Sequence, residues 1–142
     1  MKPLRLFFIC MITMMSLSSG AQNEPQLRWA VVGSKIINFK ADKAIIPIKL
    51  KDTPFTTIRL GFKGGEVKMH HSTILFKNGE TQTVPMVKKF KSGNMTRIVD
   101  LHGGKREIVK LEIYYSPDHL TKNQVTVELW AKIEIDNNLT KN

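Results

Sequence analysis

The chain has 142 residues, of which 42% are hydrophobic and 24% charged; this composition is typical of a water-soluble globular protein and excludes a disordered or membrane-embedded one. This length suits one domain with a substantial core and is too short for two domains of ordinary size. The net charge of +10 at pH 7 favours anionic partners.

The first 21 residues have the pattern of a secretory signal peptide. Lys2 and Arg5 precede an apolar run at Leu6–Met15, and small and polar residues follow up to Ala21. Residues in this order are typical of an export signal, and the run is too short to span a bilayer. We therefore predict cleavage before Gln22 and an exported mature protein, periplasmic or secreted, with no membrane span.

Export also removes Cys10, the only cysteine of the chain. The mature protein therefore has no disulfide, no thiol nucleophile and no cysteine-ligated metal. Loss of Lys2 and Arg5 lowers the net charge to +8, so the mature protein is still basic.

Apolar and polar residues alternate with a period of two along most of the remaining chain. This alternation predicts β-strands with one face toward a core and one toward water. In chain order the predicted strands are Leu27–Gly33, Ile36–Phe39, Ile45–Leu50, Ile58–Lys63, Val67–His71, Thr73–Phe76, Gln82–Val87, Thr96–Leu101, Val109–Tyr115 and Val125–Ile133.

Glycines mark the predicted turns between these strands. Asn78-Gly79 separates two strand patterns and is expected to supply the positive φ angles of a tight hairpin turn. Gly64-Gly65 and Gly103-Gly104 predict two further turns. Met86–Lys91 has apolar residues at mixed spacing, which predicts a helical turn, and no long helix is expected.

Many short strands without a helix for a parallel crossover predict an all-β fold. We predict a single antiparallel β-sandwich, jelly-roll-like, of about 8–10 short strands, formed by residues 22–142 with its core at about 27–135. Pro47 and Pro85 cannot donate to a strand ladder, so their strands are expected at sheet edges or with bulges. The polar tail Asp136–Asn142 is expected to fray.

Several segments resemble one protein family. The most specific is Gly93–Tyr115, which begins GNMTRIVDLHGGKREI and ends LEIYY. Weaker likenesses lie at Trp29–Gly33, Phe39–Asp42, Thr57–Leu60 and Asn78-Gly79. Together, over about Trp29–Ile133, they resemble the YaaI-like domain-of-unknown-function family of small exported bacterial proteins.

This resemblance implies a signal peptide followed by one all-β domain. It implies no known activity, ligand or catalytic residue. The chain departs from the family pattern at His70, His71 and the basic stretch Lys88–Lys91.

The common motifs of enzymes do not occur in the sequence, which has no nucleophile elbow, zinc-protease helix, phosphate-binding loop or dinucleotide fingerprint. His70 and His71 are adjacent on a predicted strand, so they point to opposite faces and cannot hold one metal ion together. His71 is expected to face the core and His70 the solvent. His102 and His119 lie in predicted loops. We therefore expect no metal, no cofactor and no catalysis.

Asp100 and Arg106 flank the Gly103-Gly104 turn, and two interpretations are open. A carboxylate beside a cation is one arrangement of a catalytic base. The alternation places Asp100 on the same face as Ile98, however, so a partly buried Asp100 that pairs with Arg106 for structural reasons is the preferred hypothesis. No second carboxylate can be placed at the distance that glycoside hydrolysis requires.

Two large aromatic residues fall on the polar side of their strands. The apolar residues of Val125–Ile133 face the core, so Trp130 faces outward, and the same count puts Tyr114 on the outer face of its strand. If these last two strands form a hairpin, Trp130 and Tyr114 present rings with charged neighbours, a composition suited to stacking on sugar rings. The alternatives are that Trp130 covers the sheet or packs under the segment around Leu27, or that the patch is a protein docking site.

Basic residues cluster at two turns. Lys88, Lys89 and Lys91 lie close together in the chain, and Lys105 and Arg106 lie at another turn. These positions are expected to attract a polyanion such as lipopolysaccharide, teichoic acid or an acidic glycan, the alternative being a solvated basic surface. Export argues against nucleic acid as the partner.

The sequence thus predicts an exported β-sandwich that acts as a non-catalytic binding or envelope-associated module. The first alternative is a protein that binds carbohydrate or a polyanion, and the second is a small periplasmic hydrolase. The expected partner is an anionic envelope glycan or an envelope protein. The candidate ligand contacts are Trp130, Tyr114, Lys88, Lys89, Lys91, Lys105 and Arg106.

Overall fold

The computed structural model describes residues 26–122 and 124–135. Within them the chain forms nine β-strands and one 3-10 helix, η1 (Pro117–His119). The predicted signal peptide, residues 1–21, and the predicted fraying tail, Asp136–Asn142, lie outside the described residues. No helix among the described residues is long and apolar enough to cross a membrane.

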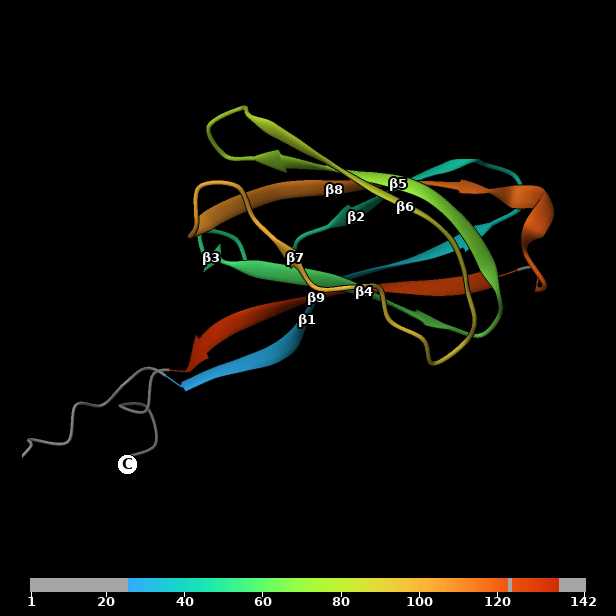
Figure 1. Cartoon of the computed structure of the whole chain (residues 1–142), viewed down its shortest axis with the longest axis horizontal. Coiled ribbons are helices and arrows are strands. Elements are labelled where there is room, and N and C mark those ends of the chain that lie inside the picture. Colours follow the sequence, from blue (N-terminus) through green and yellow to red (C-terminus); the bar gives the residue numbers. More distant parts are fainter. Residues whose placement is uncertain (1–25, 123, 136–142) are drawn as a thin grey trace, which may run out of the picture.

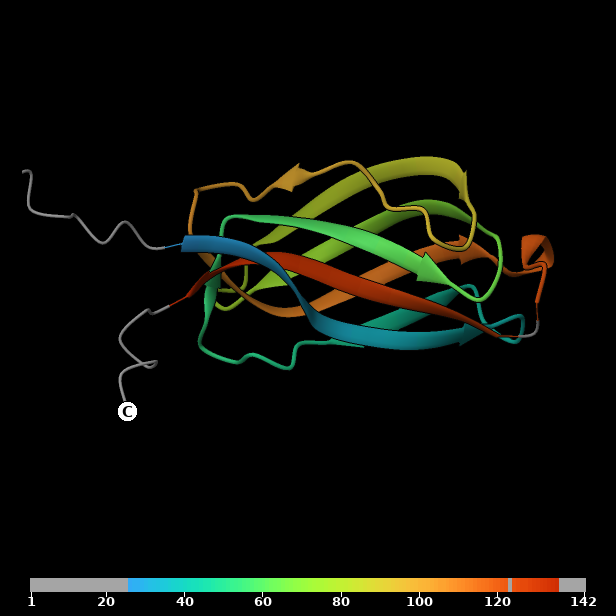
Figure 2. The ribbon, with the colours of Figure 1, turned by 90° about the horizontal axis from the view of Figure 1, so that it is seen from below.

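The strands form two antiparallel sheets that pack face to face (Figure 1). The first sheet contains, in spatial order, β1 (Gln26–Asn38), β9 (Gln124–Ile135), β4 (Thr57–Lys63) and β7 (Val99–Asp100). The second sheet contains β2 (Lys43–Pro47), β8 (Arg106–Ser116), β5 (Val67–Phe76) and β6 (Thr81–Phe90), and the two-residue β3 (Pro54–Phe55) pairs with β8. Figure 2 looks onto the first sheet, with β1, β9 and β4 in front.

The strand pairs are nested along the chain. β5 pairs with β6, β4 with β7, β2 with β8 and β1 with β9, so each strand of the first half meets its counterpart in the second half. A long antiparallel ribbon that folds over into two sheets in this way is a jelly roll. The predicted antiparallel β-sandwich is therefore confirmed.

The two sheets bury their facing side chains in one core. On β4 the inward side chains Ile58, Leu60 and Phe62 are at most 3% exposed, and the inward side chains of β9 from Val125 to Ala131 are fully buried. The Phe62 ring stacks on Phe90 of β6 with centroids 4.7 Å apart, which joins the two sheets. Each fully buried large apolar side chain stabilises the fold by about 1.5–3 kcal/mol, so this interior is the main source of stability.

The two prolines lie where the sequence predicted them. Pro47 is the last residue of β2 and Pro85 lies within β6, and these are the two outer strands of the second sheet. An edge strand has one side without a neighbour, so a residue that lacks an N–H costs no ladder hydrogen bond there.

Two pairs of predicted strands are single continuous strands. Leu27–Gly33 and Ile36–Phe39 fall on β1, and Val67–His71 and Thr73–Phe76 fall on β5. The pairing of each strand shifts register at a β-bulge, between Val31 and Gly33 on β1 and between Met69 and His71 on β5. A bulge inserts one residue and resets the alternation, which makes one strand look like two in the sequence.

The predicted hairpin at Asn78-Gly79 is confirmed, because this turn joins β5 to β6. Only Gly79 has a positive φ, of 89°, whereas both residues were expected to have one. The Gly79 N–H donates to the Phe76 carbonyl at 3.0 Å, and the Asn78 side chain accepts from the Glu80 N–H at 3.0 Å. Asn78 therefore stabilises the turn through its side chain.

The predicted helical turn at Met86–Lys91 is wrong. β6 continues through Phe90, with Met86 and Phe90 buried and the lysines between them exposed. Pairing with β5 and burial of Phe90 against Phe62 outweigh the mixed spacing of the apolar residues.

The two sheets approach each other closely at Gly33, so adding a single methyl group there should destabilise the fold. A Cβ atom at Gly33 would lie 2.4 Å from the Pro47 carbonyl oxygen and 2.9 Å from Ile46 Cγ2. Because the first contact is to backbone, β1 and β2 have to separate to admit it. We expect Gly33→Ala to lower the free energy of unfolding by about 1–3 kcal/mol, measured by urea denaturation.

The neighbouring Ser34→Ala is the matched control. Ser34 follows Gly33 on β1 and is half-buried, so its loss should change the free energy of unfolding by less than about 0.5 kcal/mol. Equal effects of the two substitutions would contradict the close approach as the cause.

Candidate functional site

Trp130 lies on the outer face of the first sheet, as the alternation predicted. Its neighbours on β9, Leu129 and Ala131, are fully buried, whereas Trp130 is half-buried. A Cβ atom at Gly61 of β4 would lie 2.9 Å from the indole Nε1. The glycine therefore gives the indole room to lie across the β4 backbone, so Trp130 covers this part of the sheet.

Trp29 joins Trp130 on this face. Trp29 pairs with Lys132 of β9, and Arg59 of β4 pairs with Trp130. The Arg59 guanidinium carbon lies 4.4 Å from the centre of the Trp29 ring, and Lys132 Nζ lies 5.5 Å from it. We call Trp29, Arg59, Trp130 and Lys132 the indole–cation face. It holds both tryptophans of the chain.

The two cations of this face have no carboxylate partner among the residues that the structure describes. Neither Arg59 nor Lys132 takes part in an ion pair within the described residues. Glu128, on the same side of β9, is only 8% exposed and pairs with Lys63 at 2.8 Å. The positive charge of Arg59 and Lys132 is thus left for an external anion.

Two buried donors on this face are also unused. Thr57 Oγ1 and Arg59 Nε are the buried side-chain atoms of the described residues that have no hydrogen-bond partner. They lie two residues apart on β4, on the side away from the inward Ile58 and Leu60. An unsatisfied buried polar group costs about 1–3 kcal/mol, and a bound water molecule is the usual partner of such a group.

Sequence reasoning missed Trp29 and Arg59. Both lie in segments whose alternation was recognised, and Arg59 falls between Ile58 and Leu60 on the outer face. The strand order β1-β9-β4 was the missing information, because only this order brings the two residues to Trp130.

Tyr114 lies on the opposite side of the molecule. β8 belongs to the second sheet and β9 to the first, so the predicted hairpin between the last two strands is wrong. The chain crosses from one sheet to the other through η1. Trp130 and Tyr114 do face outward, as predicted, but from different sheets, and they do not form one surface.

Tyr114 is engaged by its neighbours. Its ring stacks on His71 with centroids 4.2 Å apart, and its hydroxyl donates to Glu112 Oε2 at 3.0 Å. The pKa of the Glu112 carboxyl is lowered, first by a hydrogen bond from Lys110 and then by those from Tyr114 and Lys43. These contacts hold Glu112 ionised and fix the Tyr114 ring.

The predicted inward orientation of His71 is also wrong. The bulge in β5 lies between Met69 and His71, so the alternation resets there and His71 faces outward onto Tyr114, not toward the core. His70 faces the same hollow, about 420 Å³ in volume, and its Nε2 lies 2.6 Å from Ser116 Oγ. No cluster of three or more His, Cys, Asp or Glu side chains in the described ranges could hold a metal ion.

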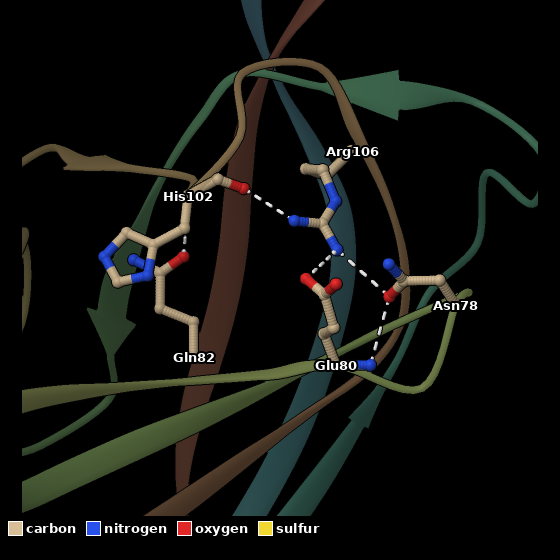
Figure 3. A network of polar contacts seen from close by, with 5 residues as sticks. All are labelled: Asn78, Glu80, Gln82, His102 and Arg106. Carbon is tan, nitrogen blue, oxygen red and sulfur yellow. Dashed lines mark hydrogen bonds and ion pairs between the residues drawn. The ribbon is translucent and has the colours of Figure 1, made fainter.

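The predicted pair of Asp100 and Arg106 is not formed. Arg106 instead binds Glu80 at 3.0 Å, the Asn78 side chain at 3.0 Å and the His102 carbonyl at 2.7 Å (Figure 3). Its guanidinium carbon lies 4.0 Å from the centre of the Phe76 ring. Arg106 therefore ties the β5–β6 turn to the β7–β8 loop.

Asp100 is exposed, and its predicted partial burial is wrong. Thr96–Ile98 is not a strand, so the alternation does not run through it; Val99 and Leu101 are buried and Ile98 is exposed. The Gln82 side chain donates to the Asp100 carbonyl and accepts from the His102 N–H, which fastens the same loop (Figure 3).

The predicted lysines lie at separate places. Lys105 pairs with Glu134. Lys88, Lys89 and Lys91 are exposed at the end of β6 and take part in no ion pair of the described residues, and Lys89 lies opposite Lys68 of β5. The predicted ligand contacts therefore divide among several surfaces.

The family model "Domain of unknown function (DUF2541)" matches residues 7–131. No curated protein matches the chain. Among solved structures, the chain is similar to Pseudomonas aeruginosa AlgX, with 14% identity, a TM-score of 0.46 and coverage of 75% of this chain; it spans 27% of the AlgX chain.

Arg106 is thus expected to act on stability. Its side chain is only 16% exposed, so Arg106→Gln removes charged hydrogen bonds and the contact with Phe76. We expect the free energy of unfolding to fall by about 1–2 kcal/mol, measured by urea denaturation.

Lys105→Gln is the control for this prediction. Its ion pair with Glu134 is solvent-exposed, so the loss should be below about 0.5 kcal/mol. A loss for Arg106→Gln as small as that of the control would show that the network of Figure 3 does not hold the loop.

Proposed function

Since the chain belongs to the family of the Domain of unknown function DUF2541, we propose its function from the chemistry of its own surface. It is a non-catalytic, envelope-associated binding module that takes an anionic carbohydrate on the indole–cation face. The observation that carries this proposal is the presence, on one outward sheet face, of both tryptophans and of two cations that form no ion pair within the described residues.

The indoles fit the ring of a sugar. An indole that lies across a sheet offers a flat apolar surface, and tryptophan contributes a large contact area with little loss of side-chain freedom. Trp130 lies across Gly61, next to Arg59. A sugar ring on Trp130 therefore lies within reach of a guanidinium.

The cations fit the acidic group of such a sugar. Arginine presents a planar fork of donors that matches a carboxylate or phosphate, and lysine adds a point charge. The contact of Arg59 with the Trp29 ring orients the guanidinium before a ligand arrives. Less conformational freedom is then lost on binding.

Export places the protein where such polymers occur. The basic, apolar and small residues of segment 1–21 support a signal peptide, and the cysteine-free mature chain would keep a charge of +8. The likeness of Gly93–Tyr115 to the YaaI-like proteins supports the same exported class. We therefore place the protein in the periplasm or outside the cell, with an anionic envelope glycan as its partner and an envelope protein as the alternative.

The proposal is tested by calorimetric titration of the full chain with polygalacturonate, an acidic polymer, and with neutral dextran. We expect binding of the acidic polymer only. Trp130→Ala and Arg59→Gln should each weaken the affinity for polygalacturonate by about tenfold or more, because the first removes the stacking surface and the second removes the cation. Since Trp130→Ala also removes packing, thermal unfolding of each variant is measured alongside.

Matched controls come from the other surfaces. Tyr114→Ala removes an aromatic ring from the second sheet, and Arg97→Gln removes an exposed arginine outside the face. Both should leave the affinity within about twofold. Equal binding of dextran, or equal losses in the controls, would refute the proposal; capture of an envelope protein through the same face would point to docking instead.

A small hydrolase is the second candidate, because Ser116 Oγ lies 2.6 Å from His70 Nε2 at the surface hollow. In ester hydrolysis the Ser116 oxygen would attack the carbonyl carbon while His70 takes the hydroxyl proton. His70 would then pass this proton to the departing alkoxide, and water would hydrolyse the acyl group from Ser116. Turnover of p-nitrophenyl acetate should then disappear in Ser116→Ala and persist in Ser34→Ala. Equal rates for these two variants would exclude this candidate.

A further inference from the structure

One end of the sandwich gathers turns from both sheets. Figures 1 and 2 place the β1–β2 and β4–β5 turns, the loop after β6 and η1 at the end opposite the described termini. The Tyr115 N–H donates to the Asp42 carbonyl at 3.0 Å, and the Gly64 N–H to Ser92 Oγ at 3.1 Å. We call these turns, with residues 35–45, the loop end.

Apolar side chains are exposed at this end. Ile36 is 55% exposed, Phe39 54% and Ile45 44%. Ile36 and Ile45 line a groove of about 390 Å³ between β1 and β2, together with Ala41 and Ala44. Phe39 lies in the turn that connects the same two strands. Exposed apolar side chains this close together are typical of an interaction site.

Lysines surround the apolar residues. Lys35 and Lys40 flank Phe39 in the chain, and Lys91 and Lys122 lie on neighbouring turns; none of the four takes part in an ion pair of the described residues. The acidic residues of these turns are Asp42, Glu66 and Asp118, and Asp118 lies 3.7 Å from His119. The loop end therefore carries an excess of positive charge.

Exposed apolar side chains on the same turns as lysines that form no ion pair within the described residues match the surface of an anionic bilayer. The apolar groups enter the boundary between headgroups and acyl chains, while the lysines pair with lipid phosphates. A second copy of this chain fits less well, because lysines would then face lysines. We propose that the loop end docks on an anionic lipid bilayer, with Phe39, Ile36 and Ile45 as its apolar contacts.

This surface is separate from the indole–cation face. Trp29 lies in the first half of β1, near the described termini, whereas Lys35 and Phe39 lie at its far end. Docking through the loop end thus leaves the indole–cation face at the side of the molecule, open to a second ligand.

The test is co-sedimentation of the full chain with vesicles of phosphatidylglycerol mixed with phosphatidylcholine, or of phosphatidylcholine alone, at low and high salt. The variants are Lys35→Glu with Lys40→Glu, and Phe39→Ser. All proteins keep the same first 25 residues, so the apolar run at Leu6–Met15 contributes equally to each.

The controls make the same changes at the opposite end of the sandwich. Lys49→Glu with Lys51→Glu matches the charge reversal, and Leu50→Ser matches the loss of an exposed apolar side chain. These residues lie in the connection from β2 to β3, near the turn between β5 and β6, because Lys77 of that turn binds Asp52 at 3.0 Å.

We expect the chain to sediment with the anionic vesicles far more than with the neutral ones, and less at high salt. The loop-end lysine variant and Phe39→Ser should each reduce the bound fraction by about fivefold or more, and the controls by less than about twofold. The proposal would be overturned by equal binding to neutral vesicles or by equal losses in the controls. It would also be overturned if the chain self-associated without binding vesicles and Phe39→Ser abolished this self-association.

Discussion

Inward packing of one face of each strand determines what every other residue of this molecule can do. Because Ile58, Leu60 and Phe62 of β4 and the apolar residues of β9 are buried against the second sheet, Arg59 and Trp130 have to face outward. A shift of one residue in the register of either strand would turn its inward side chains outward and its outward side chains inward. The core therefore fixes the composition of the outer surface.

Much of the fold follows from the sequence on this basis. The alternation predicted the strands and the outward position of Trp130, the prolines predicted the edge strands β2 and β6, and Asn78-Gly79 predicted the β5–β6 turn. All of these depend on residues close together in the chain, where the period of two is a direct consequence of strand geometry.

Most of the errors have one of two physical causes. The first is the β-bulge: the extra residue near His70 turns His71 outward, and in the same way a register shift in β8 leaves Val109 exposed and buries Ile108. The second is long-range pairing. The alternation of one strand does not show which strands lie beside it. The sequence therefore could not predict that β8 and β9 lie in different sheets, that Trp29 contacts Arg59 or that Arg106 pairs with Glu80.

Nested pairing also separates the surfaces of the molecule. The indole–cation face lies on the first sheet, the hollow at His70 and Tyr114 on the second, and the basic and apolar loop end between them. The Arg106 network holds loops and leaves no free donor fork for a ligand (Figure 3). The two proposed surfaces are therefore far enough apart for a polymer on one and a bilayer on the other.

The outer face of the first sheet is the proposed binding surface, and the two tryptophans report on it directly. Each indole N–H gives its own signal in a ¹H–¹⁵N spectrum, and both belong to this face. On addition of polygalacturonate, we expect both indole signals to shift together while the backbone signals of Tyr114 and His71 stay in place. Indole signals that stay unchanged while other regions shift would contradict this expectation.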